Sequence, residues 1–496
     1  MNILDPHAMR AWEDQTLCSG VTVETLMQVA VDGMFVSLSE QFPPMKCLVL
    51  AGKGNNGSDA LWLASRLRAA GWNVEVWLSH PRDADTMFHH AIQDEVGRAV
   101  VWPDVPEGAM EGSDQVIVID GLLGLGAKGA PREPYASILR WVESQVRPFD
   151  LRVAVDVPSG LDGDTGEAYD PCFKADLTLA LGAVKIGCVR GDGPMQCGRL
   201  RMLPLPLSGS GPKAGRDFFT LEEARALCRH REVDTHKHRQ GVVGIRAGSM
   251  GMAGAAVLAS RAAIRSGAGL VRLAVDPELM PLLATATPEV MVQALGRDGE
   301  LGSLLTDCDA LLIGPGIGLG KGAEHSVLQM VEQSRCPLVW DADALTLMAR
   351  LGLSFSGISE RSVVTPHAGE FRRLFPEGNG NRESDAGQFA ALNPGLTLCL
   401  KGPNTLVTLV AAHGQNISYN GSGNPGLATA GSGDVLAGLL AGLLATGMNT
   451  WDAARLSVFW HGLAGDLAAR RVGETSMIAG DIVDDLGSAR LLICRP

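Results

Sequence analysis

The sequence lacks the signatures of several common protein classes. Its ten cysteines form no C-x-x-C pair and do not cluster with histidine, so zinc sites and dithiol redox motifs are not expected. No run of about 18 apolar residues occurs, and the N-terminus lacks the apolar segment of a secretory signal. We therefore expect a cytoplasmic protein with reduced, mostly buried thiols and no membrane partner.

Positive charge is also scarce. The formal net charge of −13 leaves no basic surface field for a nucleic acid or an anionic membrane. Any phosphate-bearing ligand must therefore be held locally, by loops, lysine and metal. The 61 glycines follow no fixed period, which excludes collagen and indicates tight turns or phosphate-binding loops instead.

The length of 496 residues exceeds what one hydrophobic core usually organises, and the 46% apolar content is enough for two cores. Apolar strands alternate with helical segments in both halves, which predicts two α/β domains with parallel sheets. Residues Leu203 to Gly215 concentrate proline, glycine and serine and read as a linker. We place the domains at residues 1–210 and 217–496. The predicted strands are Lys46–Ala51, Asn73–Leu78, Gln115–Ile119, Leu151–Val155, Asp176–Leu181 and Leu200–Leu203, then Val242–Ala247, Leu270–Val275, Ala310–Ile313, Leu338–Trp340, Ser362–Thr365 and Leu396–Leu400.

The stretch from Asn424 to Asp434 precedes a long helix rich in alanine and leucine. Its glycines leave the backbone N–H groups of the first helical turn accessible, which favours an anion site with a carboxylate inside it. A simpler interpretation is that Ser432 or Asp434 only caps the helix, which would stabilise it by about 0.3–1 kcal/mol. One capping residue would not need Gly431 and Gly433 as well.

Other glycine-rich or polar segments follow predicted strands of the second half. Because the carboxyl ends of parallel strands meet at one sheet edge, these loops should converge there. Lys401 can neutralise phosphate charge at that edge, and no Walker-type motif is present. The segments are Gly248–Ala255, Gly314–Gly318, Asp341–Leu345, Thr365–Phe371 and Lys401–Thr405.

In the first half, Gly52-Lys-Gly-Asn-Asn-Gly57 matches the dinucleotide-binding pattern G-x-G-x-x-G. The acidic residue expected at the end of the next strand is missing, so this signal is weak. Asn55 to Asp59 instead supply amide and carboxylate oxygens suited to a hard cation or to ligand hydroxyls. Asp120 and Asp156 also end predicted strands, so they should meet Asn56 and Ser159 in one crevice.

Four motifs of the first half resemble the NAD(P)H-hydrate epimerase domain, which has a Rossmann-like fold. They are Asn55-Asn-Gly-Ser-Asp59, Asp120-Gly-Leu-Leu-Gly124, Arg132-Glu-Pro-Tyr135 and Asp156-Val-Pro-Ser-Gly-Leu-Asp162. The resemblance implies that Asn56, Asp120 and Ser159 bind a potassium ion and that Asp156 and Lys128 transfer protons at the hydrated nicotinamide ring. The substrate-binding residues that it implies are Asn55, Asn56, Gly57, Ser58, Asp59, Gly124, Leu125, Gly126, Ala127, Lys128, Gly129, Ala130, Tyr135 and Asp156.

From about His236 to Ile482 the loops resemble the ADP/ATP-dependent NAD(P)H-hydrate dehydratase domain, which has a ribokinase-like fold. This resemblance implies that Ala255, Gly316, His367 and Asp434 face the hydrated cofactor. It also implies an adenine-nucleotide site formed by Lys401, Gly402, Pro403, Asn404, Thr405 and Gly433.

Together, the two halves resemble the family of bifunctional NAD(P)H-hydrate repair enzymes. The resemblance implies epimerisation at C6 of hydrated NADH or NADPH and ADP-driven dehydration of the S form, with Mg²⁺ at the nucleotide and Asp434 as the base. ATP as donor stays open. We also expect a homo-oligomer. The main alternative is a ribokinase-like vitamin kinase whose N-terminal domain serves only for binding or oligomerisation.

Overall fold

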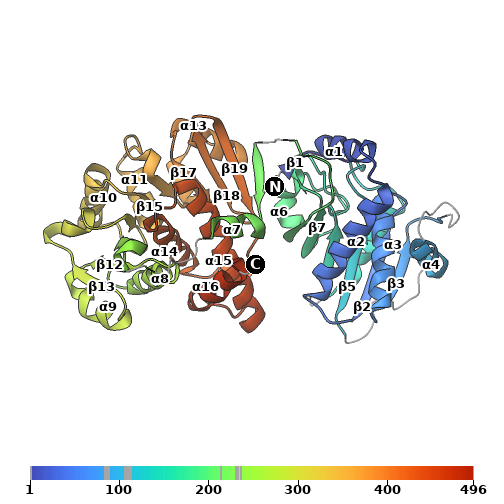
Figure 1. Cartoon of the computed structure of the whole chain (residues 1–496), viewed down its shortest axis with the longest axis horizontal. Helices are drawn as coiled ribbons and strands as arrows, with labels where there is room; N and C mark the ends of the chain where they lie inside the picture. Colours follow the sequence, from blue (N-terminus) through green and yellow to red (C-terminus); the bar gives the residue numbers. More distant parts are fainter. Residues whose placement is uncertain are drawn as a thin grey trace. The chain divides into compact units, whose positions relative to one another are not determined.

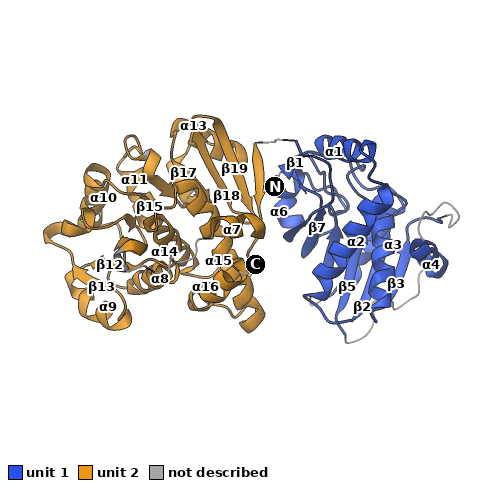
Figure 2. Cartoon of the chain, in the orientation of Figure 1, with its two compact units in different colours: residues 1–214 blue, residues 215–496 orange. Residues whose placement is uncertain are grey.

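The computed structural model describes residues 3–82, 90–104, 114–148, 150–209, 211–212, 215–228, 234 and 237–494 (Figure 1). The chain forms two compact units, Met1–Ala214 and Gly215–Pro496 (Figure 2). The division falls inside the segment rich in proline, glycine and serine that separates the two alternating patterns.

The N-terminal unit is built around a parallel sheet that has seven strands within the described residues, in the order β4-β3-β2-β5-β6-β7-β9. The strands of the whole N-terminal unit, including the separate pair β1 and β8, are β1 (Ile3–Leu4), β2 (Lys46–Ala51), β3 (Asn73–Leu78), β4 (Val100–Val101), β5 (Val116–Gly121), β6 (Leu151–Val155), β7 (Leu177–Leu181), β8 (Val184–Lys185) and β9 (Arg199–Leu203). Its helices are α1 (Pro6–Cys18), α2 (Val23–Ser39), α3 (Asn55–Ala69), α4 (His90–Arg98), α5 (Tyr135–Gln145) and α6 (Gly193–Gln196). The short strands β1 and β8 pair separately.

Both faces of this sheet are buried, so its strands are continuous apolar runs. In β2, Cys47 and Val49 pack in the core that α2 and α3 cover, whereas Leu48 and Leu50 pack in the opposite core with α5. This alternation is the period of two that a strand imposes. The predicted bounds Lys46–Ala51 are therefore confirmed.

The C-terminal unit contains a sheet of ten described strands in the order β10-β19-β18-β17-β16-β15-β14-β11-β12-β13. The strands are β10 (Arg216–Phe219), β11 (Val242–Arg246), β12 (Leu270–Val275), β13 (Met291–Ala294), β14 (Ala310–Ile313), β15 (Leu338–Trp340), β16 (Ser362–Val364), β17 (Thr397–Leu400), β18 (Leu406–Ala411) and β19 (Gly414–Asn420). The helices are α7 (Leu221–Leu227), α8 (Ala253–Arg265), α9 (Met280–Ala286), α10 (Lys321–Gln333), α11 (Ala342–Arg350), α12 (Ala368–Leu374), α13 (Arg382–Leu392), α14 (Ser432–Ala445), α15 (Thr450–Val472) and α16 (Ala479–Cys494).

Helix α14 is buried along most of its length, as an apolar helix inside a large core should be. Two glycines of α14 lie so close to α8 and to Ser266, the C-cap residue of α8, that a side chain would not fit. A Cβ on Gly438 would lie 2.1 Å from the carbonyl oxygen of Ala259, and one on Gly442 would lie 1.8 Å from Ser266 Oγ. This close packing fixes the helix and therefore the position of its N-terminal turn.

Two local predictions differ from the structure. The pairs β17–β18 and β18–β19 are antiparallel, although only parallel pairing was expected, because connections of five and two residues are too short for a crossover. The sequence pattern predicts a helix over Asp59–Ala70 preceded by a polar loop, but α3 begins at Asn55, so Asn55 to Ser58 lie in its first turn. Gly54 is the N-cap residue, and glycine is one of the residues preferred at that position.

The expectation that all cysteines are reduced is wrong for one pair. Cys228, at the end of α7, and Cys494, at the end of α16, form a disulfide with a Cα–Cα distance of 6.2 Å. The two residues are 266 positions apart, so no spacing motif in the sequence could reveal the pairing. Among the helices of the described residues, none is long and apolar enough to cross a membrane.

Candidate active sites

The potassium ligands predicted in the N-terminal unit come together at the carboxyl edge of its sheet. Ser159 Oγ donates to Asp120 Oδ1 at 2.7 Å, and Ser159 N donates to Asp120 Oδ2 at 2.7 Å. Asn56 Nδ2 donates to the carbonyl oxygens of Leu123 at 2.7 Å and Val155 at 3.1 Å. Residues from three separate chain segments thus surround one point, as the parallel topology predicts.

The chemistry of this set suits a monovalent cation. Burial raises the pKa of Asp120 to about 6, although hydrogen bonds from Ser159 and Leu122 partly oppose the shift. Within the described chain, no three His, Cys, Asp or Glu side chains gather as a possible metal site. The set therefore offers one carboxylate with neutral amide, hydroxyl and carbonyl oxygens, which are hard ligands of low total charge.

Asp156 follows β6 in a left-handed conformation, with φ of 67°. Such a backbone is uncommon outside glycine, although aspartate tolerates it better than most residues. Asp156 Oδ1 accepts hydrogen bonds from Lys185 Nζ and, at 2.9 Å, from Leu181 N. The lysine that contacts Asp156 is thus Lys185, which the sequence analysis missed. Its only signal was a lysine between the apolar residues Val184 and Ile186.

Two further carboxyl groups face Asp156. Burial raises the pKa of Asp59 well above its usual value, and the charges of Asp156 and Glu13 raise it further. Burial also raises the pKa of Glu13, which belongs to α1 and was not predicted as a site residue. Within the described residues, Asp59 Oδ1 is buried without a hydrogen-bond partner. Burial thus raises the pKa of both carboxyl groups that interact with Asp156, and the charge of Lys185 opposes the shift of Glu13.

The predicted substrate loop, residues 124–130, follows β5 and lies beside Asn56, whose Cβ would be 3.2 Å from a Cβ on Gly124. Arg10 of α1 donates to the carbonyl oxygen of Leu125 at 2.6 Å and so holds the loop. Lys128 is exposed on it.

Ser58 and Tyr135 border the same edge. Arg82 Nη2 donates to Ser58 Oγ at 2.8 Å, and the Tyr135 ring lies 5.3 Å from the ring of His80. Gly57 must be glycine, because a Cβ would lie 1.9 Å from the carbonyl oxygen of Gly52. Arg10 and Arg82 carried no sequence signal, since only the tertiary structure brings them to these loops.

In the C-terminal unit, the N-terminal turn of α14 is not closed by a side chain. Its N-cap is Gly431, with φ of 88°, and in the described structure no side chain makes the capping hydrogen bond. Ser432 Oγ instead lies 3.3 Å from Nε2 of the buried His461. The interpretation of Ser432 or Asp434 as a simple cap is therefore wrong, and the helix N-terminus keeps its affinity for an anion.

Lys401 lies beside this turn. Its Nζ donates to Asp341 Oδ1 at 2.8 Å and is 4.0 Å from Glu370 Oε2. Burial alone would lower the pKa of Lys401, but Asp341 and Glu370 outweigh it and raise the pKa. A Cβ on Gly433 would lie 3.3 Å from Lys401 Nζ, so glycine there lets the ammonium group approach the helix. The turn and Lys401 form one corner, in which Asp341 and Glu370 lie beside the ammonium group.

Asp434 lies in the first turn of α14, and its pKa is raised. Burial raises its pKa to about 7, the charges of Asp341 and Asp343 add to the shift, and Lys401 opposes it. A carboxylate with such a pKa can take a proton from a hydroxyl group at physiological pH. The corner can thus hold a phosphoryl group next to a general base.

The other predicted residues of this unit lie around the same sheet edge. Gly316, with φ of 59°, packs on Ala255, whose Cβ would be 3.1 Å from a Cβ on Gly316. His367 caps α12 through Nδ1, which accepts from Gly369 N at 2.9 Å, and its Nε2 lies 3.4 Å from Glu370 Oε1.

Residues 401–405 form the turn between β17 and β18, with Asn404 at φ of 46°. Arg382 supports this turn by donating to the carbonyl oxygens of Leu400 at 2.8 Å and Pro403 at 2.5 Å. Burial lowers the pKa of Arg382. No sequence pattern indicated this arginine, which comes from α13.

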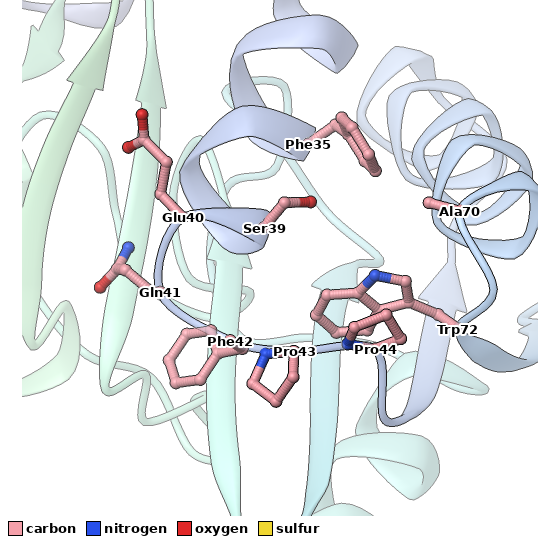
Figure 3. Close-up of a pocket in the computed structure, with 9 residues that line it drawn as sticks. All are labelled: Phe35, Ser39, Glu40, Gln41, Phe42, Pro43, Pro44, Ala70 and Trp72. Atoms are coloured by element: carbon pink, nitrogen blue, oxygen red, sulfur yellow. The ribbon is translucent and has the colours of Figure 1, made fainter.

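A hollow of about 470 Å³ lies elsewhere in the N-terminal unit (Figure 3). Its lining residues are Phe35, Ser39, Glu40, Gln41, Phe42, Pro43, Pro44, Ala70 and Trp72. Pro44 and Trp72 precede β2 and β3, so the hollow lies at the amino ends of the strands. The predicted site residues follow the carboxyl ends, and the hollow is therefore separate from them.

Two protein-family models match the chain. The model described as YjeF-related protein N-terminus matches residues 23–187, and the model described as NAD(P)H-hydrate dehydratase matches residues 243–487. Each match falls within one of the two compact units.

Curated relatives match nearly the whole chain. The bifunctional NAD(P)H-hydrate repair enzyme Nnr of Moorella thermoacetica is 35% identical over 89% of this chain and 86% of its own length. The enzyme of the same name from Coxiella burnetii is 34% identical over 96% and 97%. Among solved structures, a ribokinase-like superfamily protein from Enterococcus faecalis is 28% identical, with a TM-score of 0.53 over 58% of this chain and all of its own. The C-terminal unit thus has the ribokinase-like fold, and the N-terminal parallel sheet is Rossmann-like.

Proposed function

We propose the following function on the basis that this chain belongs to the family of bifunctional NAD(P)H-hydrate repair enzymes. The N-terminal unit interconverts the R and S forms of hydrated NADH and NADPH at C6. The C-terminal unit dehydrates the S form to NADH or NADPH and converts ADP to AMP and phosphate. The observation that carries the proposal is the position of Asp434, a base with a pKa of about 7, beside an anion-binding helix N-terminus.

In the dehydration step, Asp434 takes the proton from the C6 hydroxyl, whose oxygen attacks the terminal phosphoryl group of ADP. AMP leaves, while Lys401 and the N–H groups of α14 stabilise the charge on the transferred group. The phosphate then leaves C6 with assistance from the ring nitrogen, and the departing phosphate takes a proton from C5, which forms the C5–C6 double bond of the reduced ring. Ala255, Gly316 and His367 face that ring. The nucleotide is bound by Lys401, Gly402, Pro403, Asn404, Thr405 and Gly433.

Mg²⁺ fits this site as an ion that arrives with the nucleotide. In the described part of the chain no group of three His, Cys, Asp or Glu side chains could hold a metal ion, and Mg²⁺ needs only one or two carboxylates beside phosphate oxygens and water. Asp343 is the carboxylate that would be available to it. The ion would supply neutralising charge at the phosphates.

In the epimerisation step, Asp156 exchanges a proton with the substrate, and Lys128 acts from the loop at residues 124–130. Asn56, Asp120 and Ser159 hold K⁺, which would supply positive charge beside the buried Asp120 carboxylate. Because epimerisation returns the same atoms in the opposite arrangement, each proton taken up must be returned within the same turnover.

The test uses the purified full-length chain with a mixture of R and S hydrated NADH and either ADP or ATP. We expect complete recovery of reduced-nicotinamide absorbance with stoichiometric release of AMP from ADP. Recovery of only the S fraction would contradict the epimerase assignment. Recovery without nucleotide, or accumulation of a phosphorylated product, would contradict the dehydratase assignment and favour a kinase.

The rate of dehydration should depend on pH with an acidic limb near pH 7. Asp434 must be ionised to act as base, and its raised pKa of about 7 means that this form is lost as pH falls below about 7. We expect kcat/KM to fall about tenfold per pH unit there. In Asp341→Asn the limb should move to lower pH, because the neighbouring negative charge is gone. A limb that stays below pH 5 in the unmodified chain would contradict this prediction.

Epimerisation should require K⁺. Replacing K⁺ by tetramethylammonium at constant ionic strength is expected to reduce the epimerisation rate, since the large cation cannot enter the oxygen cage. Asp120→Asn should raise the K⁺ concentration for half-maximal rate at least about tenfold, which corresponds to about 1.4 kcal/mol. A rate independent of K⁺ in the unmodified chain would show that the cage does not serve this ion.

A further inference from the structure

The two oxygens of the Asp156 carboxylate have different surroundings. Oδ1 accepts two hydrogen bonds, from Lys185 Nζ and Leu181 N. Within the described residues, Oδ2 accepts none, and the side chain keeps 11% of its surface exposed. One oxygen is therefore fixed by the protein, and the other remains available to a ligand.

Lys185 is held in place from both sides. Its Nζ also donates to the carbonyl oxygen of Leu181 at 2.8 Å, and its side chain is 1% exposed. Its backbone lies in β8, where it pairs with Leu4 of β1. The ammonium group thus has little freedom to leave the carboxylate.

A buried lysine is a costly way to stabilise a fold. Burial of an ion pair removes both charges from water, and a well-packed apolar pair is often at least as stable. Lysine is almost never fully buried unless it is paired. A lysine retained under these conditions indicates a role for its charge beyond packing.

Two carboxyl groups interact with this pair, and Arg10 interacts with one of them, Glu13, from the same helix. Asp59 reaches it from α3 and Glu13 from α1, and burial favours the protonated form of each. Lys185 therefore lies among three carboxyl groups and makes its hydrogen bond to one of them, Asp156.

We infer that Lys185 is a positioning residue of the epimerase site: it holds Oδ1 of Asp156 and leaves Oδ2 as the oxygen that exchanges a proton with the substrate. This inference rests on the proposed epimerase function. The proton of the C6 hydroxyl moves to Oδ2, which becomes a carboxylic acid, while the C6–O bond becomes a carbonyl and the C6–N1 bond breaks with its electron pair on the ring nitrogen. When N1 attacks the opposite face of the carbonyl, the C6–N1 bond forms again and the proton returns from Oδ2 to the oxygen. Lys185 keeps its own protons throughout and does not touch the substrate.

The test compares Lys185→Met in the full-length chain with Lys174→Met, which removes the same charge from an exposed position of the same unit. We expect Lys185→Met to lower kcat for epimerisation about 100-fold, with KM changed less than about threefold. Lys174→Met should leave both constants unchanged. Dehydration of the S form by the same molecules reports that the chain remains intact.

A second variant covers the case in which Lys185→Met unfolds the N-terminal unit, as seen by loss of one thermal transition. Lys185→Arg keeps the charge but moves the donors, so we expect kcat to fall about tenfold at unchanged KM. A kcat within about threefold of the unmodified chain in either folded variant would overturn the inference, as would a loss confined to KM. Absence of epimerisation in the unmodified chain would instead overturn the proposed function.

Discussion

Asp434→Asn is expected to abolish nearly all dehydration, lowering kcat by about 10²–10⁴-fold, the usual contribution of a general base. The amide has almost the shape of the carboxylate but cannot accept the hydroxyl proton. Because no described side chain depends on Asp434 as a cap, the helix should keep its structure. The affinity for ADP should change less than about threefold, or improve slightly, since a negative charge near the phosphates is removed.

Two comparisons make this prediction specific. Asp484→Asn changes an exposed aspartate of α16 that pairs with Arg261, so it should leave dehydration unchanged. Nucleotide affinity can be measured by calorimetry, and kcat by recovery of reduced-nicotinamide absorbance. An Asp434→Asn variant with more than about a third of the normal kcat would remove Asp434 from the role of base.

Asp156→Asn should lower the rate of epimerisation by about 10²–10⁴-fold while dehydration of pure S substrate continues at its normal rate. With a mixture of epimers, the variant should recover only the S fraction quickly. The replacement also leaves the buried Lys185 ammonium group without its counter-charge, which costs about 3–5 kcal/mol when one partner of a buried pair is removed. A lower melting temperature of the N-terminal unit is therefore part of the expected result.

The stability effect has its own control. Asp94 is an exposed aspartate of α4, so Asp94→Asn should change neither the rate nor the melting temperature. Epimerisation rates should be compared well below the melting temperature of the variant, where the unit is folded. Normal epimerisation by folded Asp156→Asn would contradict the proton-transfer role of this residue and the inference about Lys185 together.

Much of the fold could be predicted because its signals are local. Buried parallel strands are continuous apolar runs, and six of them have the predicted bounds: β2, β3, β6, β12, β14 and β15. The antiparallel hairpin of β18 and β19 was missed, because β19 (Gly414–Asn420) lacks an apolar run and includes polar residues such as Gln415 and Asn416. The early start of α3 was missed because Asn55 and Gly57 are poor helix formers in isolation.

The site residues divide in the same way. Those at strand ends, such as Asp120, Asp156 and Lys401, could be found because parallel strands bring their carboxyl ends to one edge whatever the connections between them. Glu13, Arg82 and Arg382 could not be found, because they reach the loops from helices or connections that only the tertiary structure places there.

The sequence by itself determined the two α/β domains, the glycine-rich turn before Asp434 and the strand-end carboxylates, since each follows from neighbouring residues and from sheet topology. Only the tertiary structure decided which lysine contacts Asp156, which cysteines pair and how strongly Asp434 is buried. Contacts of this kind depend on how distant segments pack, and burial, which sets the pKa of Asp434 to about 7, exists only in the folded chain.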